Sequence, residues 1–256
     1  MTFVTSKDGT RIAYDRQGGG PAVVLVGGGL DDGSENAPLA AELADHFTVY
    51  NYARRGRGDS GDTPPYVVDR EIEDIEALVA EAGGSAHLYG VSSGGMFALE
   101  AAASGLAIDR LAVYEVPYDT ADDAPRRYQE YRERLGAALA GGRRGEAVEL
   151  FMQLAGSSEE DIRGARTSPY WSGLEALAHT LAYDAALYGR PPADRLATIA
   201  QPTLVATGGG GGDLFESAAN AIAASIPRAE RRTVEGQGHV VDPKAFAPAL
   251  VRFFGD

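Results

Sequence analysis

Ser92 lies at the centre of a five-residue stretch, Gly90-Val91-Ser92-Ser93-Gly94, that could make a serine reactive. A serine hydroxyl is a weak nucleophile at neutral pH, so it needs a base, an exposed position and a nearby site for negative charge. Apolar residues precede the stretch and helix-forming residues follow it, which predicts a sharp strand-to-helix turn with glycines relieving its crowding. We predict that Ser92 is an activated nucleophile and that the backbone N–H of Ser93 faces the developing oxyanion.

His239 is the histidine best placed to act as the base for Ser92. It ends the stretch Gly236-Gln237-Gly238-His239, in a glycine-rich turn after the last predicted strand. A base in this role takes the serine proton and later returns it to the leaving group. A turn histidine that only contacts solvent is the alternative interpretation. The other histidines lie in or beside predicted strands or in a helical region, where structural roles are expected: His46, His87 and His179.

Strand and helix patterns alternate over the first 116 residues, which is typical of a doubly wound sheet with helices on both faces. The pair Asp8-Gly9 is typical of a hairpin between the first two strands. Strands are expected at Thr2–Ser6, Arg11–Gln17, Ala22–Val26, Phe47–Tyr52, Ala86–Gly90, Leu111–Tyr114, Thr203–Thr207 and Glu230–Val234. Helices are expected at Pro38–Ala44, from a cap at Asp69 to Gly83, at Gly94–Ala103, at Leu214–Ser225 and in a final stretch ending near Phe254.

The segment between Tyr118 and Pro192 differs from the rest in its predicted elements, because helical patterns follow one another there without strands. We expect a core formed by residues 1–117 and 193–256, and a helical lid formed by residues 118–192. Trp171, the only tryptophan, is the expected wall of a substrate pocket. The helices of this segment are expected at Pro125–Leu139, Arg144–Leu154, Ser158–Arg166 and Leu174–Tyr188.

With these elements in place, the chain resembles the α/β-hydrolase family over essentially its whole length. The resemblance rests on four stretches that occur in the family's order: Val23–Gly29, Arg55–Ser60, the turn at Ser92, and Gly236–His239. It implies a mostly parallel eight-stranded sheet, with the helical lid inserted after the sixth strand. It also implies that the arginine-rich turn is structural and packs near the mouth of the active site.

The resemblance assigns a second oxyanion donor to the loop after the third strand, Gly27-Gly28-Gly29-Leu30. We expect the backbone N–H of Gly28 to be that donor and Gly29 to adjoin the substrate pocket. Many relatives have a histidine before the glycines where this chain has Val26, but a backbone donor does not need that side chain. A dinucleotide-binding glycine pattern is disfavoured, because its sixth position holds Asp32 instead of glycine.

The third catalytic residue, an acid that orients the histidine, has two candidates. The family usually takes it from the loop after the seventh strand, here Thr207–Leu214, where Gly211 occupies the usual position and the nearest carboxylate is Asp213. Some relatives, including certain haloalkane dehalogenases, carry the acid directly after the sixth strand, where this chain has Glu115. We favour Glu115 over Asp213; the remaining possibility is that no acid operates. Asp213 could instead cap a helix, and Glu115 could pair with an arginine.

Composition limits the function classes that need considering. The chain of 256 residues has no cysteine and no histidine pair at metal-binding spacing, so neither a metal nor another cofactor is expected. Its net charge of −14 argues against nucleic acid and anionic membranes as partners. No apolar run has transmembrane length and the first residues do not resemble a signal peptide, which predicts a cytoplasmic protein. A homodimer remains open.

The favoured function is a serine hydrolase that cleaves a small ester-like substrate with an apolar portion: a carboxylic ester, a lactone or a thioester. The reaction would pass through an acyl-enzyme. A cofactor-free perhydrolase or a carbon–carbon bond hydrolase could use the same residues. A dehalogenase is disfavoured, because its nucleophile would be an aspartate and position 92 is serine. A catalytically weak member of the fold that binds a small ligand is the alternative from another class.

Overall fold

The computed structural model describes residues 2–210 and 212–255, which form an eight-stranded sheet. The strand order is β1-β2-β4-β3-β5-β6-β7-β8; β2 pairs antiparallel with both its neighbours, and the other pairs are parallel. The predicted fold class is therefore confirmed. The strands are β1 (Thr2–Thr5), β2 (Arg11–Gly18), β3 (Ala22–Val26), β4 (Thr48–Tyr52), β5 (Ala86–Val91), β6 (Ile108–Tyr114), β7 (Thr203–Gly208) and β8 (Ala229–Val234).

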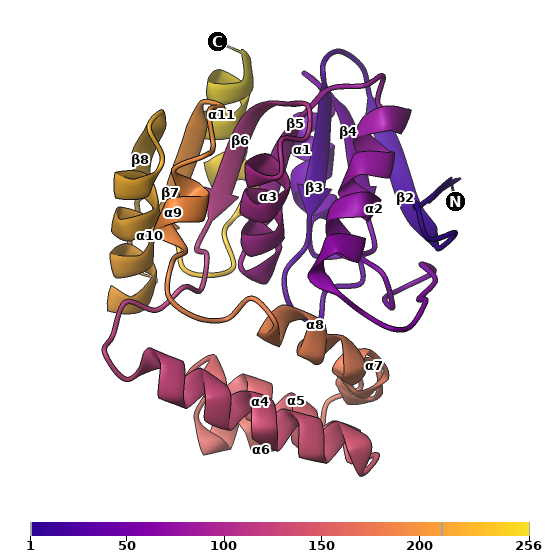
Figure 1. Cartoon of the computed structure of the whole chain (residues 1–256), viewed down its shortest axis with the longest axis vertical. Coiled ribbons are helices and arrows are strands. Elements are labelled where there is room, and N and C mark those ends of the chain that lie inside the picture. Colours follow the sequence, from indigo (N-terminus) through magenta and orange to yellow (C-terminus); the bar gives the residue numbers. More distant parts are fainter. Residues whose placement is uncertain (1, 211, 256) are drawn as a thin grey trace.

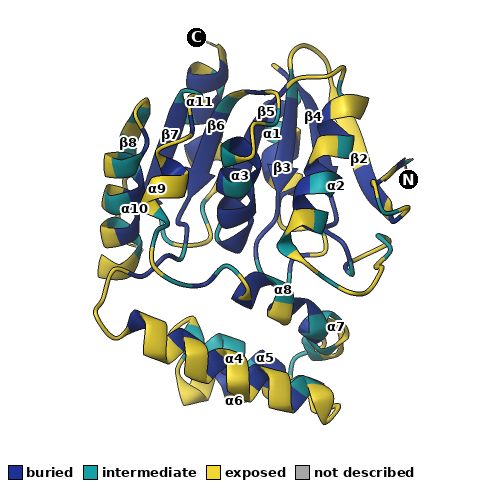
Figure 2. Cartoon of the chain, in the orientation of Figure 1, coloured by how far each residue is buried: buried dark blue, intermediate teal, exposed yellow. Residues whose placement is uncertain are grey.

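Helices cover both faces of the sheet (Figure 1). The apolar residues of α1 and α11 join one buried cluster, and those of α2, α3 and α10 join the other. The central strands between them are buried on both sides (Figure 2), which explains why β3 is continuously apolar and why every residue of β5 is buried. The helices of the core are α1 (Ala37–Leu43), α2 (Val68–Glu81), α3 (Ser93–Ala103), α9 (Ala193–Leu196), α10 (Asp213–Ser225) and α11 (Pro243–Gly255).

The sheet topology brings several loops to one edge. Strands β3, β5, β6 and β7 are parallel neighbours, so their carboxyl ends lie side by side. The loops that follow them start at Gly27, Ser92, Glu115 and Gly209. In open α/β sheets ligands bind at this edge, and every predicted catalytic residue lies in or beside one of these loops or in the loop after β8.

A group of helices without strands follows β6, and in Figure 1 it lies beyond the carboxyl edge of the sheet. The expected single helix over Leu174–Tyr188 is wrong. The structure divides this stretch, and the Thr180 hydroxyl donates to the Leu177 carbonyl at 2.8 Å where the chain tightens into a 3-10 turn. The elements are α4 (Ala124–Ala140), α5 (Arg144–Leu154), α6 (Glu159–Arg166), α7 (Trp171–Leu177), η1 (Ala178–Thr180) and α8 (Leu181–Ala185). Whether residues 118–192 act as a lid stays a prediction.

Two further details differ from the expected elements. Asp69 is not the cap of α2, because the helix begins one residue earlier and Asp69 lies in its first turn. There its negative charge still interacts favourably with the helix dipole. The short helix α9 has no counterpart among the expected elements. Among the described residues, no helix is both long and apolar enough to cross a membrane.

Candidate active site

Ser92 occupies the strained turn that its sequence predicts. Its backbone has φ 54° and ψ −130°, between the end of β5 and the start of α3. A Cβ on Gly90 would lie 2.6 Å from the Gly94 carbonyl oxygen, and one on Gly94 would lie 2.4 Å from that of Gly27. Both glycines are therefore required by close backbone packing. The strained turn places Ser92 at the carboxyl edge of the sheet.

The imidazole of His239 lies between Ser92 and Glu115. Its Nε2 is 3.2 Å from Ser92 Oγ, and its Nδ1 is 2.8 Å from Glu115 Oε2. Glu115 is buried, and its other oxygen accepts the Gly208 N–H at 2.9 Å. With its proton on Nδ1, the imidazole donates to Glu115 and leaves Nε2 free to accept the serine proton. This arrangement can activate a serine for attack on a carbonyl.

The backbone around Glu115 directs its carboxylate toward the histidine loop. Glu115 has a φ of 46°, an unusual value for a residue other than glycine, and its N–H donates to the Ala206 carbonyl of β7 at 3.0 Å. The preceding Tyr114 hydroxyl donates to the Gly238 carbonyl at 2.6 Å, beside His239. The end of β6 thus holds both the candidate acid and the loop that carries the imidazole.

The other candidate acid is not brought to the imidazole. Asp213 is exposed at the first residue of α10, and no hydrogen bond or ion pair among the described residues joins it to His239. The helix is capped by Gly212 instead of Asp213. Gly211, the position matched to the usual acid of the family, lies outside the described residues.

Phe215 is a site residue that the sequence reasoning missed. Its ring stacks on the imidazole of His239, with centroids 4.7 Å apart and planes 15° apart. Aromatic stacking of this kind limits the orientations of the imidazole. The sequence signal was weak, because one aromatic residue in a helix normally indicates packing.

The two predicted oxyanion donors lie beside Ser92. A Cβ on Gly28 would be 3.1 Å from Ser92 Cβ and 3.7 Å from its Oγ. Ser93 is the first residue of α3 and is buried. Within the described part of the chain, no hydrogen bond uses the N–H of Gly28 or of Ser93. Both groups are thus free to bind an oxyanion, and their catalytic roles remain predictions.

The structure places the predicted pocket residues Gly29 and Trp171 against different neighbours. A Cβ on Gly29 would lie 3.1 Å from Phe151 Cζ, so Phe151 of α5 covers the glycine loop that carries the candidate oxyanion donor. Trp171 packs instead within the helical segment, where its Cζ2 would lie 3.5 Å from a Cβ on Gly145. Phe151 is therefore closer to the candidate site than its sequence position suggested, and the pocket role of Trp171 stays a prediction.

The arginine-rich turn after β4 is buried and does not form a surface patch. Arg54 and Arg57 both bind the carboxylate of Asp184 in α8, through Oδ1 at 2.7 Å and Oδ2 at 2.8 Å. Arg54 also makes two hydrogen bonds to Glu71 of α2, at 2.7 and 3.0 Å. Two guanidinium and two carboxylate groups thus balance their charges in the interior, which offsets the cost of burying them. We call these four residues the buried ion cluster.

Asp184 is not among the predicted site residues, although the sequence contains a signal that its carboxylate is buried and paired. In α8 it lies three residues after Leu181, on the same face of the helix, and Leu181 and the adjacent Ala185 are both buried. An acid on an apolar face needs a partner, and the arginine-rich turn supplies it. The signal was obscured because the helix boundaries in this stretch were wrong.

The charge of Asp184 makes stability depend on pH. Burial alone would raise the pKa of this carboxyl, but Arg57 and Arg54 outweigh that effect and hold it below the usual value of 3.8. Because the folded pKa is below the unfolded one, the stabilisation is present above about pH 4 and is lost as pH falls further. We expect Asp184→Asn to lower the free energy of unfolding by about 3–5 kcal/mol at pH 7. In urea titrations this difference from the wild type should narrow below about pH 4; a constant difference down to pH 3 would contradict the assignment.

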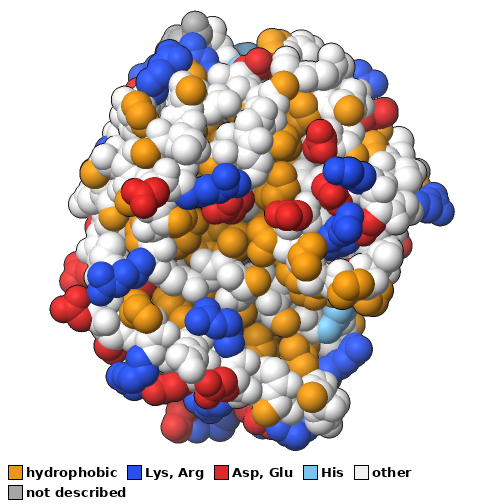
Figure 3. Space-filling view, in the orientation of Figure 1, with side chains coloured by type: hydrophobic (Ala, Val, Ile, Leu, Met, Phe, Trp, Pro, Cys, Tyr) orange, Lys and Arg blue, Asp and Glu red, His pale blue; other side chains and the backbone are white. Residues whose placement is uncertain are grey.

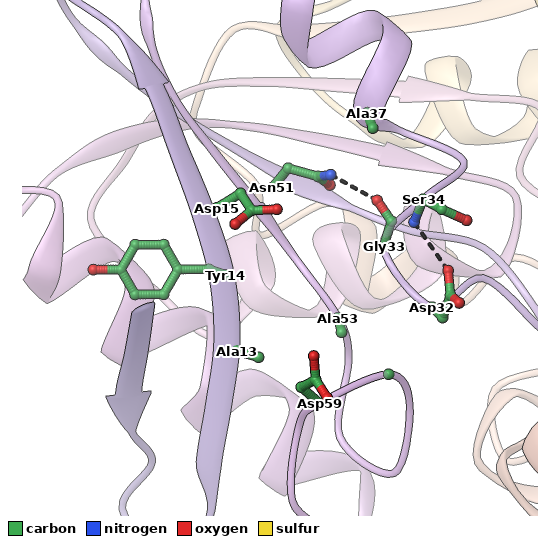
Figure 4. Close-up of a pocket in the computed structure, with 11 residues that line it drawn as sticks. Ala13, Tyr14, Asp15, Asp32, Gly33, Ser34, Ala37, Asn51, Ala53 and Asp59 are labelled. Atoms are coloured by element: carbon green, nitrogen blue, oxygen red, sulfur yellow. Dashed lines mark hydrogen bonds between the residues drawn. The ribbon is translucent and has the colours of Figure 1, made fainter. Parts of the chain in front are cut away.

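Two cavities are lined in part by the loop between β3 and α1. One, of about 360 Å³, lies at the β2–β4 side of the sheet and contains none of the residues at Ser92 (Figure 4). It is lined by carboxylates, including Asp15, Asp32 and Asp59. A smaller one of about 40 Å³ lies directly at His239. On the face seen in Figure 3, acidic and basic side chains are interspersed, without a broad basic area among the residues described.

A doubly wound sheet with a serine, a histidine and an acid at its carboxyl edge defines the class of protein. A model of the "Alpha/beta hydrolase family" matches residues 22–249. The chain belongs to the α/β-hydrolase family, and the prediction of an enzyme of this family is confirmed.

Known proteins resemble the chain over nearly its whole length. A crystal structure of an α/β hydrolase from Sphaerobacter thermophilus is 50% identical, with a TM-score of 0.91 over 99% of this chain and 100% of that one. A pimeloyl-[acyl-carrier protein] methyl ester esterase of Xanthomonas campestris pv. campestris is 31% identical over 87% of this chain and 89% of its own. A thermophilic esterase from Thermogutta terrifontis, 22% identical with a TM-score of 0.73 over 99% and 97% of the two chains, shows the fold alone.

Proposed function

We propose that this enzyme is a serine hydrolase that cleaves small carboxylic esters, or related lactones and thioesters, through an acyl-enzyme. The observation that carries the proposal is the hydrogen-bonded series Ser92–His239–Glu115, with 3.2 and 2.8 Å between successive groups. A buried carboxylate, an imidazole and a hydroxyl in this order are the groups that acyl transfer by serine requires. The proposed roles are nucleophile for Ser92, general base and acid for His239, and orienting acid for Glu115.

The proposed mechanism has two steps. Ser92 Oγ attacks the ester carbonyl while His239 Nε2 takes its proton, and the N–H groups of Gly28 and Ser93 bind the resulting oxyanion. His239 then protonates the leaving alcohol, and the acyl group stays on Ser92. In the second step His239 removes a proton from water, which attacks the acyl-enzyme and releases the carboxylic acid. Glu115 stabilises the imidazolium each time it forms.

The similarity to a methyl ester esterase supports an ester as the substrate. The covering of the oxyanion loop by Phe151 further supports a substrate with an apolar portion, because a ligand beside Gly29 would contact this ring. We propose that the substrate is a small molecule, since the net charge of −14 gives no electrostatic attraction to nucleic acid or anionic membranes.

The proposal is tested by assaying hydrolysis by the purified enzyme. The substrates are p-nitrophenyl acetate, butyrate and octanoate, with a matching alkyl lactone and thioester. We expect turnover of at least one ester, with a rapid first release of p-nitrophenol if deacylation limits the rate. Hydrogen peroxide and a carbon–carbon bond substrate (a vinylogous 1,5-diketone) serve as comparison reactants. Turnover of the diketone, or peracid formation, without ester hydrolysis would overturn the proposal in favour of those chemistries.

A further inference from the structure

Hydrogen bonds through two arginines connect the helical segment after β6 to the loop that carries the candidate oxyanion donor. Asp184 of α8 is fully buried and accepts hydrogen bonds from Arg54 and Arg57. Arg57 also donates through Nη1 to the carbonyl of Gly28, and Arg54 donates through Nη1 to that of Gly27 at 3.4 Å. In Figure 1, α8 lies between the sheet and α4, where one helix can reach both layers.

These contacts fix the directions of the backbone N–H groups beside Ser92. The peptide bonds joining Gly27, Gly28 and Gly29 are trans. In a trans peptide the C=O and the following N–H point in opposite directions. A hydrogen bond that holds the Gly27 carbonyl therefore orients the Gly28 N–H, and one that holds the Gly28 carbonyl orients the Gly29 N–H.

The glycines cannot fix this geometry alone. A glycine-rich loop has more backbone freedom than any other sequence, so its peptide planes need external contacts to hold one orientation. The two arginines supply such contacts from behind the loop, and Asp184 and Glu71 hold the arginines in place. Asp184 bonds both arginines, whereas Glu71 bonds only Arg54.

We propose that Asp184 is a positioning residue for the oxyanion hole. It holds Arg54 and Arg57 against the Gly27 and Gly28 carbonyls, so the backbone donors of the oxyanion hole have their active orientation when α8 packs against these arginines. This inference rests on the proposed function. Loss of one oxyanion donor typically lowers kcat by about 10²–10³-fold. A misdirected donor loses part of that effect, and the transition state loses more than the bound substrate does.

The test compares Asp184→Asn with Asp74→Asn. The second variant is the matched control, because Asp74 is also a buried aspartate bonded to an arginine of the same turn, Arg55, at 2.7 and 2.8 Å, but its arginine bonds no carbonyl of the glycine loop. With p-nitrophenyl acetate, we expect Asp184→Asn to lower kcat by about 10–100-fold with little change in KM. Asp74→Asn should retain kcat within about threefold where both remain folded. Equal losses of kcat in the two variants would overturn the proposal.

A second readout separates positioning from general destabilisation. A trifluoromethyl ketone forms a tetrahedral adduct with the serine and uses the oxyanion hole, so its inhibition constant should rise by the factor by which kcat/KM falls. An unchanged inhibition constant would contradict the proposal. If Asp184→Asn does not fold, Arg54→Lys serves instead, because Arg54 is the residue that bonds both Asp184 and the Gly27 carbonyl. Lysine keeps the charge beside Asp184 but lacks the forked donors, and the same kinetic losses are expected.

A crystal structure of Asp184→Asn tests the geometry without relying on activity. We expect the Gly27–Gly28 peptide plane, which carries the Gly28 N–H, to rotate or to occupy two orientations. An unchanged plane would overturn the positioning role even if ester hydrolysis is established. Conversely, a rotated plane in a protein whose wild type hydrolyses no ester would support the positioning of the loop and refute the proposed function.

Discussion

Ser92→Ala is expected to lose nearly all ester hydrolysis, with kcat about 10⁶-fold below that of the wild type. The loss follows because Ser92 Oγ is the atom 3.2 Å from the proposed base, and alanine leaves His239 with no hydroxyl to activate. The remaining rate should come from the oxyanion donors and from substrate binding, which still favour attack by water. Initial rates with p-nitrophenyl acetate at saturating substrate measure the effect.

Ser104→Ala is the matched control for this variant. Ser92 and Ser104 cap the two ends of α3, and the Ser104 hydroxyl donates to the Glu100 carbonyl at 2.8 Å, so the change tests the loss of a capping serine without touching the site. Its activity should stay within about twofold. Replacing His239 in the Ser92→Ala background should cost little more, because the two residues act as a unit. A Ser92→Ala enzyme with more than a hundredth of wild-type activity is incompatible with the mechanism.

Glu115→Gln is expected to lower kcat by about 10⁴-fold. The Gly208 N–H donates to Oε1 of Glu115, so the amide oxygen of glutamine should keep that place and turn its NH₂ toward His239. An NH₂ at this position donates to Nδ1 and moves the imidazole proton to Nε2. The imidazole can then no longer accept the proton of Ser92.

Asp213→Asn provides the comparison for Glu115→Gln, since both changes replace a candidate acid with its amide. Asp213 is exposed and does not contact the imidazole in the described structure, so this variant should keep wild-type activity within about twofold. Both variants should be assayed over a range of pH to exclude a simple shift of the optimum. A large loss in Asp213→Asn together with an active Glu115→Gln would assign the acid to the other loop.

The sheet and the turn at Ser92 could be predicted because their signals are local. Continuous apolar runs such as Val23–Val26 indicate strands buried on both faces, and the paired glycines at 90 and 94 indicate a tight strand-to-helix turn. His239 could be predicted as the base because it lies in a glycine-rich turn after the last strand. These features depend on near neighbours in the chain, so one sequence is enough to identify them.

The choice between Glu115 and Asp213 could not be made in this way. Strands β6 and β7 are parallel neighbours, so both candidate loops start at the same edge and beside the same histidine. What separates them is the positive φ of Glu115 and its hydrogen bond to Gly208, and neither has a sequence signature. The buried ion cluster was hidden for a similar reason, since Asp184 and Arg54 are 130 positions apart and meet only through the tertiary fold.

The covalent reaction of Ser92 with a fluorophosphonate tests the central claim most directly. The wild-type protein should gain the mass of one phosphonyl group, and peptide mapping should locate that group on Ser92. Ser92→Ala should gain no mass under the same conditions, and Glu115→Gln should react far more slowly than the wild type. A wild-type protein that hydrolyses esters but is never labelled, or a label that maps to another residue and persists in Ser92→Ala, would contradict the account.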